Sequence, residues 1–120
     1  MKIDITERSF KFAVCIVTLC RYLERERKVN LALISQLIRS GTSVGANIEE
    51  AQAGQSRADF LSKISISCKE CRETLYWLRL ISASDASLSD RLADIIKEAD
   101  ELVRILTSIV KTTKEGTNGN

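Results

Sequence analysis

The chain has 120 residues, of which 44% are hydrophobic and 28% charged; proline and histidine are absent, and the net charge is +2. This length corresponds to one domain, and the lack of proline favours long uninterrupted helices. Without histidine, Ser-His-Asp and Cys-His catalysis and the Glu-x-x-His motifs of di-iron bundles are excluded, and the near-neutral charge is unlike that of a strongly basic nucleic-acid-binding domain.

Four amphipathic helices are predicted, because apolar residues recur at steps of three and four along most of the chain. The connections between these helices are short, which predicts an all-α, up-and-down antiparallel four-helix bundle in a single domain, residues 1–120. The helices are expected at about residues 6–28, 30–53, 56–82 and 87–113, with a disordered tail at about 114–120.

Each predicted helix starts after a residue whose side chain can accept a backbone hydrogen bond, and the second helix ends at a glycine suited to the left-handed conformation. The start of the third helix also resembles a capping box, with aspartate in place of glutamate three residues after serine. The expected N-caps are Thr6, Asn30, Ser56 (with Asp59) and Ser87 (with Asp90), and the glycine is Gly54.

The first helix combines a broad apolar stripe with a basic end. The stripe is wide enough to contact more than one neighbouring helix. Residues 1–28 carry seven Lys or Arg against four Asp or Glu. The basic end is a candidate contact for the phosphates of RNA or DNA, or else a solvated helix end whose charge complements the helix dipole. Its members are Arg21, Arg25, Arg27 and Lys28.

The second helix has a polar lane beside its apolar stripe. Four polar residues recur at steps of four, four and three, so they stack along one side of the helix. Short residues crowd the same turns, although each glycine costs a helix about 1 kcal/mol relative to alanine; they predict a closely packed neighbour. The polar lane is Arg39, Ser43, Asn47 and Glu50, and the short residues include Gly41 and Gly45.

The third and fourth helices carry regular apolar seams, and two of the four cysteines lie on the third-helix seam. Cys68 and Cys71 are well inside that helix, away from the helix N-terminus where a redox Cys-x-x-Cys would lie. We interpret all four cysteines, with Cys15 and Cys20 on the first helix, as small apolar packing residues. A Cys₄ zinc site and disulfide chemistry are the alternatives.

Two acidic pairs, Glu70-x-x-Glu73 and Glu98-x-x-Glu101, resemble the Mg²⁺-binding carboxylates of all-α nucleotide pyrophosphohydrolases. Such pairs also occur by chance in helices, and Glu101 is expected to face water because it lies about opposite the main seam. These residues are the basis of an enzyme hypothesis.

Two aromatic residues, Tyr76 and Trp77, flank the apolar seam of the third helix. We expect them to contact a neighbouring subunit, because aromatic residues are enriched at interfaces. The alternative is a partly buried edge residue that completes the core.

Arg39 and Glu73 lie about 15 and 19 residues from the Gly54 turn, on antiparallel helices. They should therefore lie within a turn or so of the same level. We predict that they meet directly or through Asn47, in a network at least partly shielded from water.

No segment predicts export or membrane insertion. The N-terminus lacks the pattern of a signal peptide. The longest apolar run, Phe12 to Cys20, is far shorter than the roughly 20 residues that span a bilayer. We therefore expect a soluble cytoplasmic protein without a membrane partner.

The segment 36–80 is similar, without gaps, to the 23S rRNA-intervening sequence proteins, a family also called four helix bundle proteins. Members commonly follow Asn-Ile-x-Glu with Gly-x-Gly-Arg, and this chain departs from that pattern with Ala51-Gln52-Ala53-Gly54. The similarity rests on Gln36, Ile38-Arg39-Ser40, Ser43, Ala46-Asn47-Ile48, Glu50, Ser56, Asp59-Phe60, Ile66 and Glu73.

The resemblance implies an up-and-down four-helix bundle that forms a ring-like homopentamer, and a polar lane that pairs with Glu73. It implies little chemistry, because the family has no settled activity. A related branch, the accessory proteins of diversity-generating retroelements, is a basic nucleic-acid-binding pentamer.

From the residues and the resemblance together we expect a non-enzymatic, self-assembling accessory or scaffold protein, without a cofactor and with RNA or DNA as candidate partners. The alternative is an Mg-dependent pyrophosphohydrolase-like enzyme that uses the two acidic pairs. A purely structural bundle is the third hypothesis.

Overall fold

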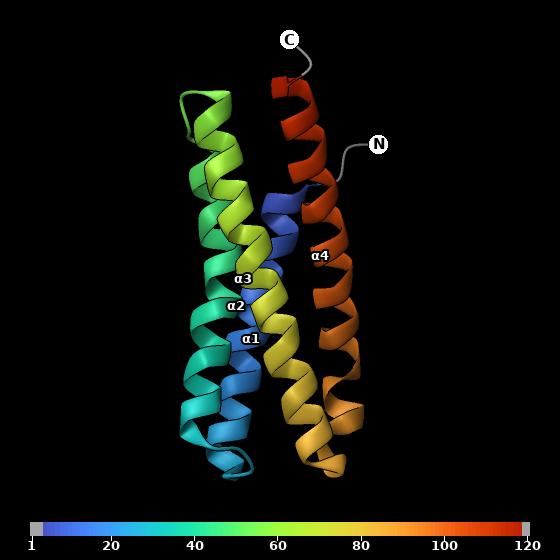
Figure 1. The fold of residues 1–120 in the computed structure, drawn as a ribbon. Helices are drawn as coiled ribbons and strands as arrows, with labels where there is room; N and C mark the ends of the chain where they lie inside the picture. The colour runs from blue at the N-terminus through green and yellow to red at the C-terminus, as the bar shows by residue number, and fades with distance from the viewer. Residues whose placement is uncertain (1–3, 119–120) are drawn as a thin grey trace.

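The computed structural model describes residues 4–118, which form four long helices that run alternately up and down (Figure 1). No strand occurs in this described part of the chain. The prediction of an all-α, antiparallel four-helix bundle is therefore confirmed. The elements are α1 (Ile5–Glu26), α2 (Leu31–Gln52), α3 (Arg57–Ser84), the short 3₁₀ helix η1 (Ala86–Leu88) and α4 (Ser89–Asn118).

The core is formed where the apolar stripes of the four helices meet. Burying one such side chain contributes roughly 1.5–3 kcal/mol to folding, so these residues supply most of the favourable free energy. Both predicted seams point inward, with Ile64 and Leu78 of α3 and Leu92 and Leu102 of α4 fully buried. Among the described helices, none is long and apolar enough to cross a bilayer.

The four helices do not pack equally against one another. α2 packs closely against both α3 and α1, and α3 against α4, whereas α1 and α4 touch in only a few places. The apolar stripe of α1 therefore has two neighbours, as predicted, but is only partly covered. Two of its residues, Phe10 and Val14, remain 60% and 50% exposed.

Glycines let the backbones of α1 and α2 approach each other. A Cβ atom added to Gly41 would lie 2.8 Å from both Cγ1 and Cγ2 of the fully buried Ile16. A Cβ atom on Gly45 would lie 3.2 Å from the carbonyl oxygen of Ser9. The close approach predicted from the short residues is confirmed, and the neighbour is α1.

The N-caps of α1 and α3 differ in how well they were predicted. The Ser56 side chain accepts a hydrogen bond from the Asp59 N–H at 3.1 Å, as a capping residue should. At α1 the prediction of Thr6 is wrong. Asp4 caps the helix by accepting from the Glu7 N–H at 3.1 Å, which places Thr6 inside the first turn.

The ends of α1 and α2 also differ from expectation. Asn30 precedes α2, but its side chain makes no capping hydrogen bond. Gly54 does not adopt the left-handed conformation, because α2 ends in a tightened right-handed turn in which the Gly54 N–H donates to the Ala51 carbonyl at 3.2 Å. The described residue with a left-handed backbone is Arg27, with φ 52°, at the end of α1.

α4 begins later and extends further than predicted. Ser87 does not cap α4 but lies inside η1, which Asp85 caps: its Oδ1 accepts hydrogen bonds from the Ser87 N–H at 3.0 Å and the Ser87 hydroxyl at 2.7 Å. η1 intervenes, and α4 starts at Ser89. The helix continues to Asn118, so the tail predicted from about 114 is wrong as far as 118, and 119–120 lie outside the described residues.

Candidate functional site

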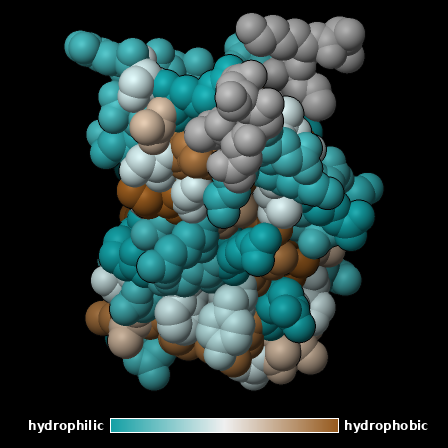
Figure 2. Space-filling view, turned by 45° about the horizontal axis from the view of Figure 1, so that its top comes forward, coloured by the Kyte–Doolittle hydropathy of each residue, from teal (hydrophilic) through white to brown (hydrophobic). Residues whose placement is uncertain are grey.

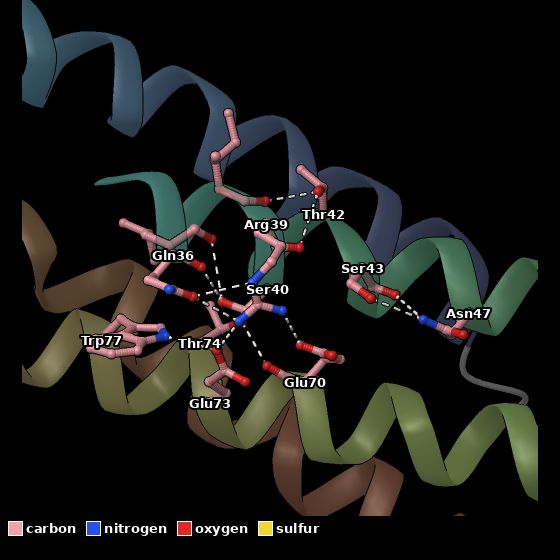
Figure 3. Close-up of polar contacts among 12 residues, drawn as sticks. Gln36, Arg39, Ser40, Thr42, Ser43, Asn47, Glu70, Glu73, Thr74 and Trp77 are labelled. Atoms are coloured by element: carbon pink, nitrogen blue, oxygen red, sulfur yellow. Dashed lines mark hydrogen bonds and ion pairs between the residues drawn. The ribbon is translucent and has the colours of Figure 1, made fainter. Parts of the chain in front are cut away.

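Arg39 joins α2 to α3 through two carboxylates (Figure 3). Its Nη1 lies 3.1 Å from Glu70 Oε1, and its Nη2 contacts Glu73 Oε2. Gln36 Oε1 accepts hydrogen bonds from Nε and Nη2 at 3.2 and 3.0 Å. The Arg39 side chain is 49% exposed, whereas those of Glu70 and Glu73 are 17% and 31% exposed. The predicted direct contact between Arg39 and Glu73 is confirmed, in a site that shields the carboxylates more than the guanidinium.

The two aromatic residues of α3 have different surroundings. The Trp77 indole N–H donates to Glu73 Oε2 at 3.0 Å, and its ring is half-buried against the core. Tyr76 is 54% exposed and meets Trp77 edge-on, with ring centroids 5.2 Å apart. Within the chain, Trp77 is thus part of the Arg39 network, and Tyr76 presents its ring to solvent.

The rest of the polar lane on α2 does not join this network. Asn47 Nδ2 donates to the Ser43 carbonyl at 2.9 Å and lies 3.0 Å from the Ser43 hydroxyl, so it bonds to its own helix one turn back (Figure 3). Glu50 instead forms an ion pair at 3.2 Å with Lys63 of α3. The predicted alternative, in which Asn47 links Arg39 to Glu73, is wrong.

A second arginine, which the sequence did not point to, joins α1 to α4. Arg8 binds Glu98 through two hydrogen bonds, Nε–Oε2 at 2.7 Å and Nη2–Oε1 at 2.8 Å, and its Nη2 also lies 2.7 Å from Glu101 Oε1. These hydrogen bonds, that to Glu98 first, raise the pKa of Arg8 further above its ordinary value. Because Arg8 and Glu98 are 90 residues apart, no local pattern links them. Glu101, which was expected to face water, is 44% exposed, and its carboxylate is also paired with Arg8.

Both acidic pairs of the enzyme hypothesis are therefore bound by arginines. Glu70 and Glu73 are turned toward α2, whereas Glu98 and Glu101 are turned toward α1. Among the described residues, no group of three or more His, Cys, Asp or Glu side chains is placed to hold a metal ion. A magnesium ion at either pair would have to displace an arginine, so this geometry favours ion pairs that join helices.

The cysteines are all free thiols, and three of them are buried. Burial raises the pKa of Cys20 to about 11 and that of Cys71 to about 12, because a thiolate loses its hydration in the core. These thiols therefore stay protonated at neutral pH. Cys15 is exposed and lines a groove of about 660 Å³ between α1 and α4, so the packing interpretation is wrong for this residue.

The four cations of the predicted basic cluster do not share one surface. Arg21, Arg25 and Arg27 line a hollow of about 1030 Å³ between α1 and α2. Arg25 also forms an ion pair at 3.6 Å with the glutamate that follows it. Lys28 is turned toward the connection between α3 and α4, where its Nζ lies 3.5 Å from the Ser87 hydroxyl. The cluster is thus a group of three arginines, partly neutralised, with Lys28 beside it.

The α1–α2 pair carries four exposed large apolar residues, among them Leu31 and Phe10, the two most exposed large apolar residues in the described part of the chain. Phe10 and Val14 of α1 are 60% and 50% exposed, and Leu31 and Ile38 of α2 are 66% and 37% exposed. Two hollows follow the groove between the helices, one beside Phe10 and the other beside Leu31 and Ile38. Val14 lies next to these residues on the side of α1 that borders the α1–α4 groove. We call these four residues the α1–α2 apolar face. Sequence reasoning found only the breadth of the α1 stripe and missed the α2 members.

The surface at the end where α2 turns into α3 is mixed in character. The space-filling view of Figure 2, turned toward that end, shows apolar patches between larger hydrophilic areas. Apolar side chains therefore reach the surface at several places on the bundle.

Comparison with known proteins identifies relatives of this fold. The model of the family described as 23S rRNA-intervening sequence protein matches residues 1–108. A crystal structure from Bacteroides thetaiotaomicron VPI-5482, of a protein with unknown function from the S23 ribosomal protein family, is 41% identical in sequence. It superposes with a TM-score of 0.83 over 89% of this chain and 98% of that chain. Among curated proteins, no sequence matches this chain.

Proposed function

We propose that this chain, which belongs to the 23S rRNA-intervening sequence protein family, is a non-catalytic accessory or scaffold protein of the cytoplasm. It assembles into a homo-oligomer, a pentamer by family resemblance, and the oligomer binds RNA or DNA through surface cations. The observation that carries the assembly step is the α1–α2 apolar face. The observation that carries the non-catalytic role is the engagement of both acidic pairs by arginines.

The α1–α2 apolar face supports assembly because four large apolar side chains are exposed on these two neighbouring helices. Single exposed apolar residues are ordinary on protein surfaces, but several on two neighbouring helices favour an interaction site. Phe10 and Leu31 are each exposed by 60% or more. Covering this face with a second copy removes these side chains from water, which yields roughly 25 cal/mol for each Å² of apolar surface.

Light scattering at a series of protein concentrations tests the assembly. We expect the wild type to be oligomeric, and the double variant Phe10→Gln and Val14→Gln to shift toward monomer with unchanged helical circular dichroism. The matched control is Ile66→Gln, because Ile66 is also a partly exposed apolar helix residue, at 39%, but lies on α3. A monomeric wild type would reject assembly, and an oligomeric double variant would reject this face.

The non-catalytic role rests on the two arginine-bound acidic pairs. A pyrophosphohydrolase needs carboxylates that are free to bind Mg²⁺, whereas Arg39 and Arg8 engage Glu73 and Glu98 here. We expect no Mg²⁺-dependent release of pyrophosphate from a panel of nucleoside triphosphates. Release that disappears in both Glu73→Gln and Glu98→Gln would instead establish the enzyme hypothesis.

Nucleic-acid binding is supported by surface cations that an oligomer repeats in every subunit, which multiplies a modest local field. The α1 end supplies Arg21, Arg25 and Arg27 beside one hollow. Binding of this kind is weak, tolerant of sequence and steeply dependent on salt. We expect a labelled uridine oligonucleotide to bind at low salt and to dissociate as salt rises. If the intact oligomer retains neither RNA nor DNA at low salt, this part of the proposal fails.

A further inference from the structure

The outward side of α3 carries a strip of cations around one exposed aromatic ring. Lys69, Arg72, Tyr76 and Arg79 follow one another at steps of three, four and three, so they share one side of the helix. All four residues are exposed. At 1.5 Å per residue the strip is about 15 Å long, which corresponds to about four nucleotides at the rise of a stacked strand. We call these residues the α3 strip.

The cations of the α3 strip are not paired with carboxylates of the described chain. Within residues 4–118, none of its three cations forms an ion pair. The two carboxylates of this part of α3, Glu70 and Glu73, are turned to the side and engaged by Arg39 of α2. Arg39 thus partly neutralises the two carboxylates nearest to the strip. At the end of α1, by contrast, Arg25 pairs with an adjacent glutamate.

Tyr76 stands beside a place that can receive a flat ring. A hollow of about 480 Å³ between α3 and α4 is lined by Tyr76 and Arg79, and its walls include Leu80, Ala83 and Ile96. An aromatic ring, an arginine and apolar walls together are the components that stack and hold an unpaired base. The edge-on contact with Trp77 leaves the Tyr76 ring 54% exposed.

We infer that the α3 strip is a binding site for single-stranded nucleic acid, with phosphates on Lys69, Arg72 and Arg79 and a base stacked on Tyr76. This inference rests on the proposed function and gives it a location that differs from the basic end of α1. Single strands are favoured over duplexes because a paired base cannot turn its face toward Tyr76. The charge of the strip complements the phosphates, and the hollow complements the base.

Fluorescence anisotropy with labelled single-stranded uridine RNA and thymidine DNA tests the site on the intact oligomer. We expect the double variant Lys69→Glu and Arg79→Glu to bind at least tenfold more weakly. The slope of log affinity against log salt should flatten by about 1.4, or 0.7 for each lost phosphate contact. The control is Lys11→Glu with Lys111→Glu, which changes the net charge equally away from the strip and is expected to bind as the wild type does.

The stacking role of Tyr76 is tested separately. Tyr76→Ala should weaken binding by about five- to 150-fold without changing the salt slope, and Tyr76→Phe should retain binding. Because the chain has one tryptophan, and Trp77 lies beside Tyr76, its fluorescence should change when a single strand binds. Equal affinity for a duplex, or full binding by Tyr76→Ala, would overturn the stacking role.

The remaining outcomes separate this site from its alternatives. If Arg25→Glu with Lys28→Glu abolishes binding and the strip variant does not, the inference is wrong and the proposed nucleic-acid binding stands. If the wild type binds no nucleic acid at low salt, both the inference and the proposed nucleic-acid binding are wrong. If Tyr76→Ala lowers the oligomer mass in light scattering, Tyr76 belongs to a subunit interface, as its sequence context suggested, and the site is rejected.

Discussion

The ion pair of Arg8 with Glu98 is expected to stabilise the bundle more than an ordinary surface pair. Arg8→Met keeps the apolar stem and removes the charge, and Glu98→Gln keeps the shape of the side chain. The single variants and the double variant together form a cycle that isolates the interaction energy. The pair joins α1 to α4, the two neighbouring helices with the sparsest packing. Its loss is therefore expected to weaken the contact between α4 and the first turns of α1.

The size of this interaction follows from its geometry. Two charges about 4 Å apart attract by about 4 kcal/mol at an effective dielectric constant of 20. The side chains of Arg8 and Glu98 are 28% and 32% exposed, so they lose part of their hydration, and ordering an arginine costs up to about 2 kcal/mol. The difference leaves a coupling of about 1–2 kcal/mol. The two-point contact of the guanidinium places the value above that of exposed pairs.

Denaturant unfolding at one fixed protein concentration measures the coupling, because the stability of an oligomer, the state proposed for this protein, depends on concentration. The matched control is the pair Lys11 and Glu7, also on α1, whose side chains are 74% and 61% exposed. Its coupling should be about 0.3–0.5 kcal/mol and should vanish at high salt. A coupling between Arg8 and Glu98 no larger than that of the control would refute the assignment of a stabilising link between α1 and α4.

Three further predictions concern the core. Gly41→Ala should destabilise the bundle by about 1–3 kcal/mol despite alanine's better helix propensity, because the new Cβ meets the fully buried Ile16. Denaturant unfolding of Gly41→Ala, Ile16→Ala and the double variant should show that the losses in unfolding free energy are not additive. An aromatic disulfide reagent at neutral pH should label Cys15 fast and Cys20 and Cys71 only after unfolding, since burial raises the pKa of these two thiols to about 11 and about 12. Elemental analysis of untagged protein should find no stoichiometric zinc, and its presence would contradict the packing interpretation of the buried cysteines.

Local regularities of the sequence determined the helices and the type of fold. Each seam at steps of three and four fixes which side of a helix is apolar, and such sides can be buried only against one another. Ser56 and Asp59 marked the start of α3 because a capping bond spans three residues and is visible in the sequence. The pairing of Arg39 with Glu73 could be predicted for a related reason. A short turn at Gly54 ties α2 to α3, so counting residues from the turn sets their relative level.

Contacts between α1 and α4 were decided only by the tertiary structure. Periodicity shows that a helix side is apolar, but not which neighbour covers it or how completely. For this reason the sequence did not indicate that Arg8 would meet Glu98 across 90 residues, that Cys15 would face a groove, or that Phe10 would stay exposed. The α1–α4 contact depends on how closely α1 packs against the glycines of α2. That distance is set by the packing of all four helices together.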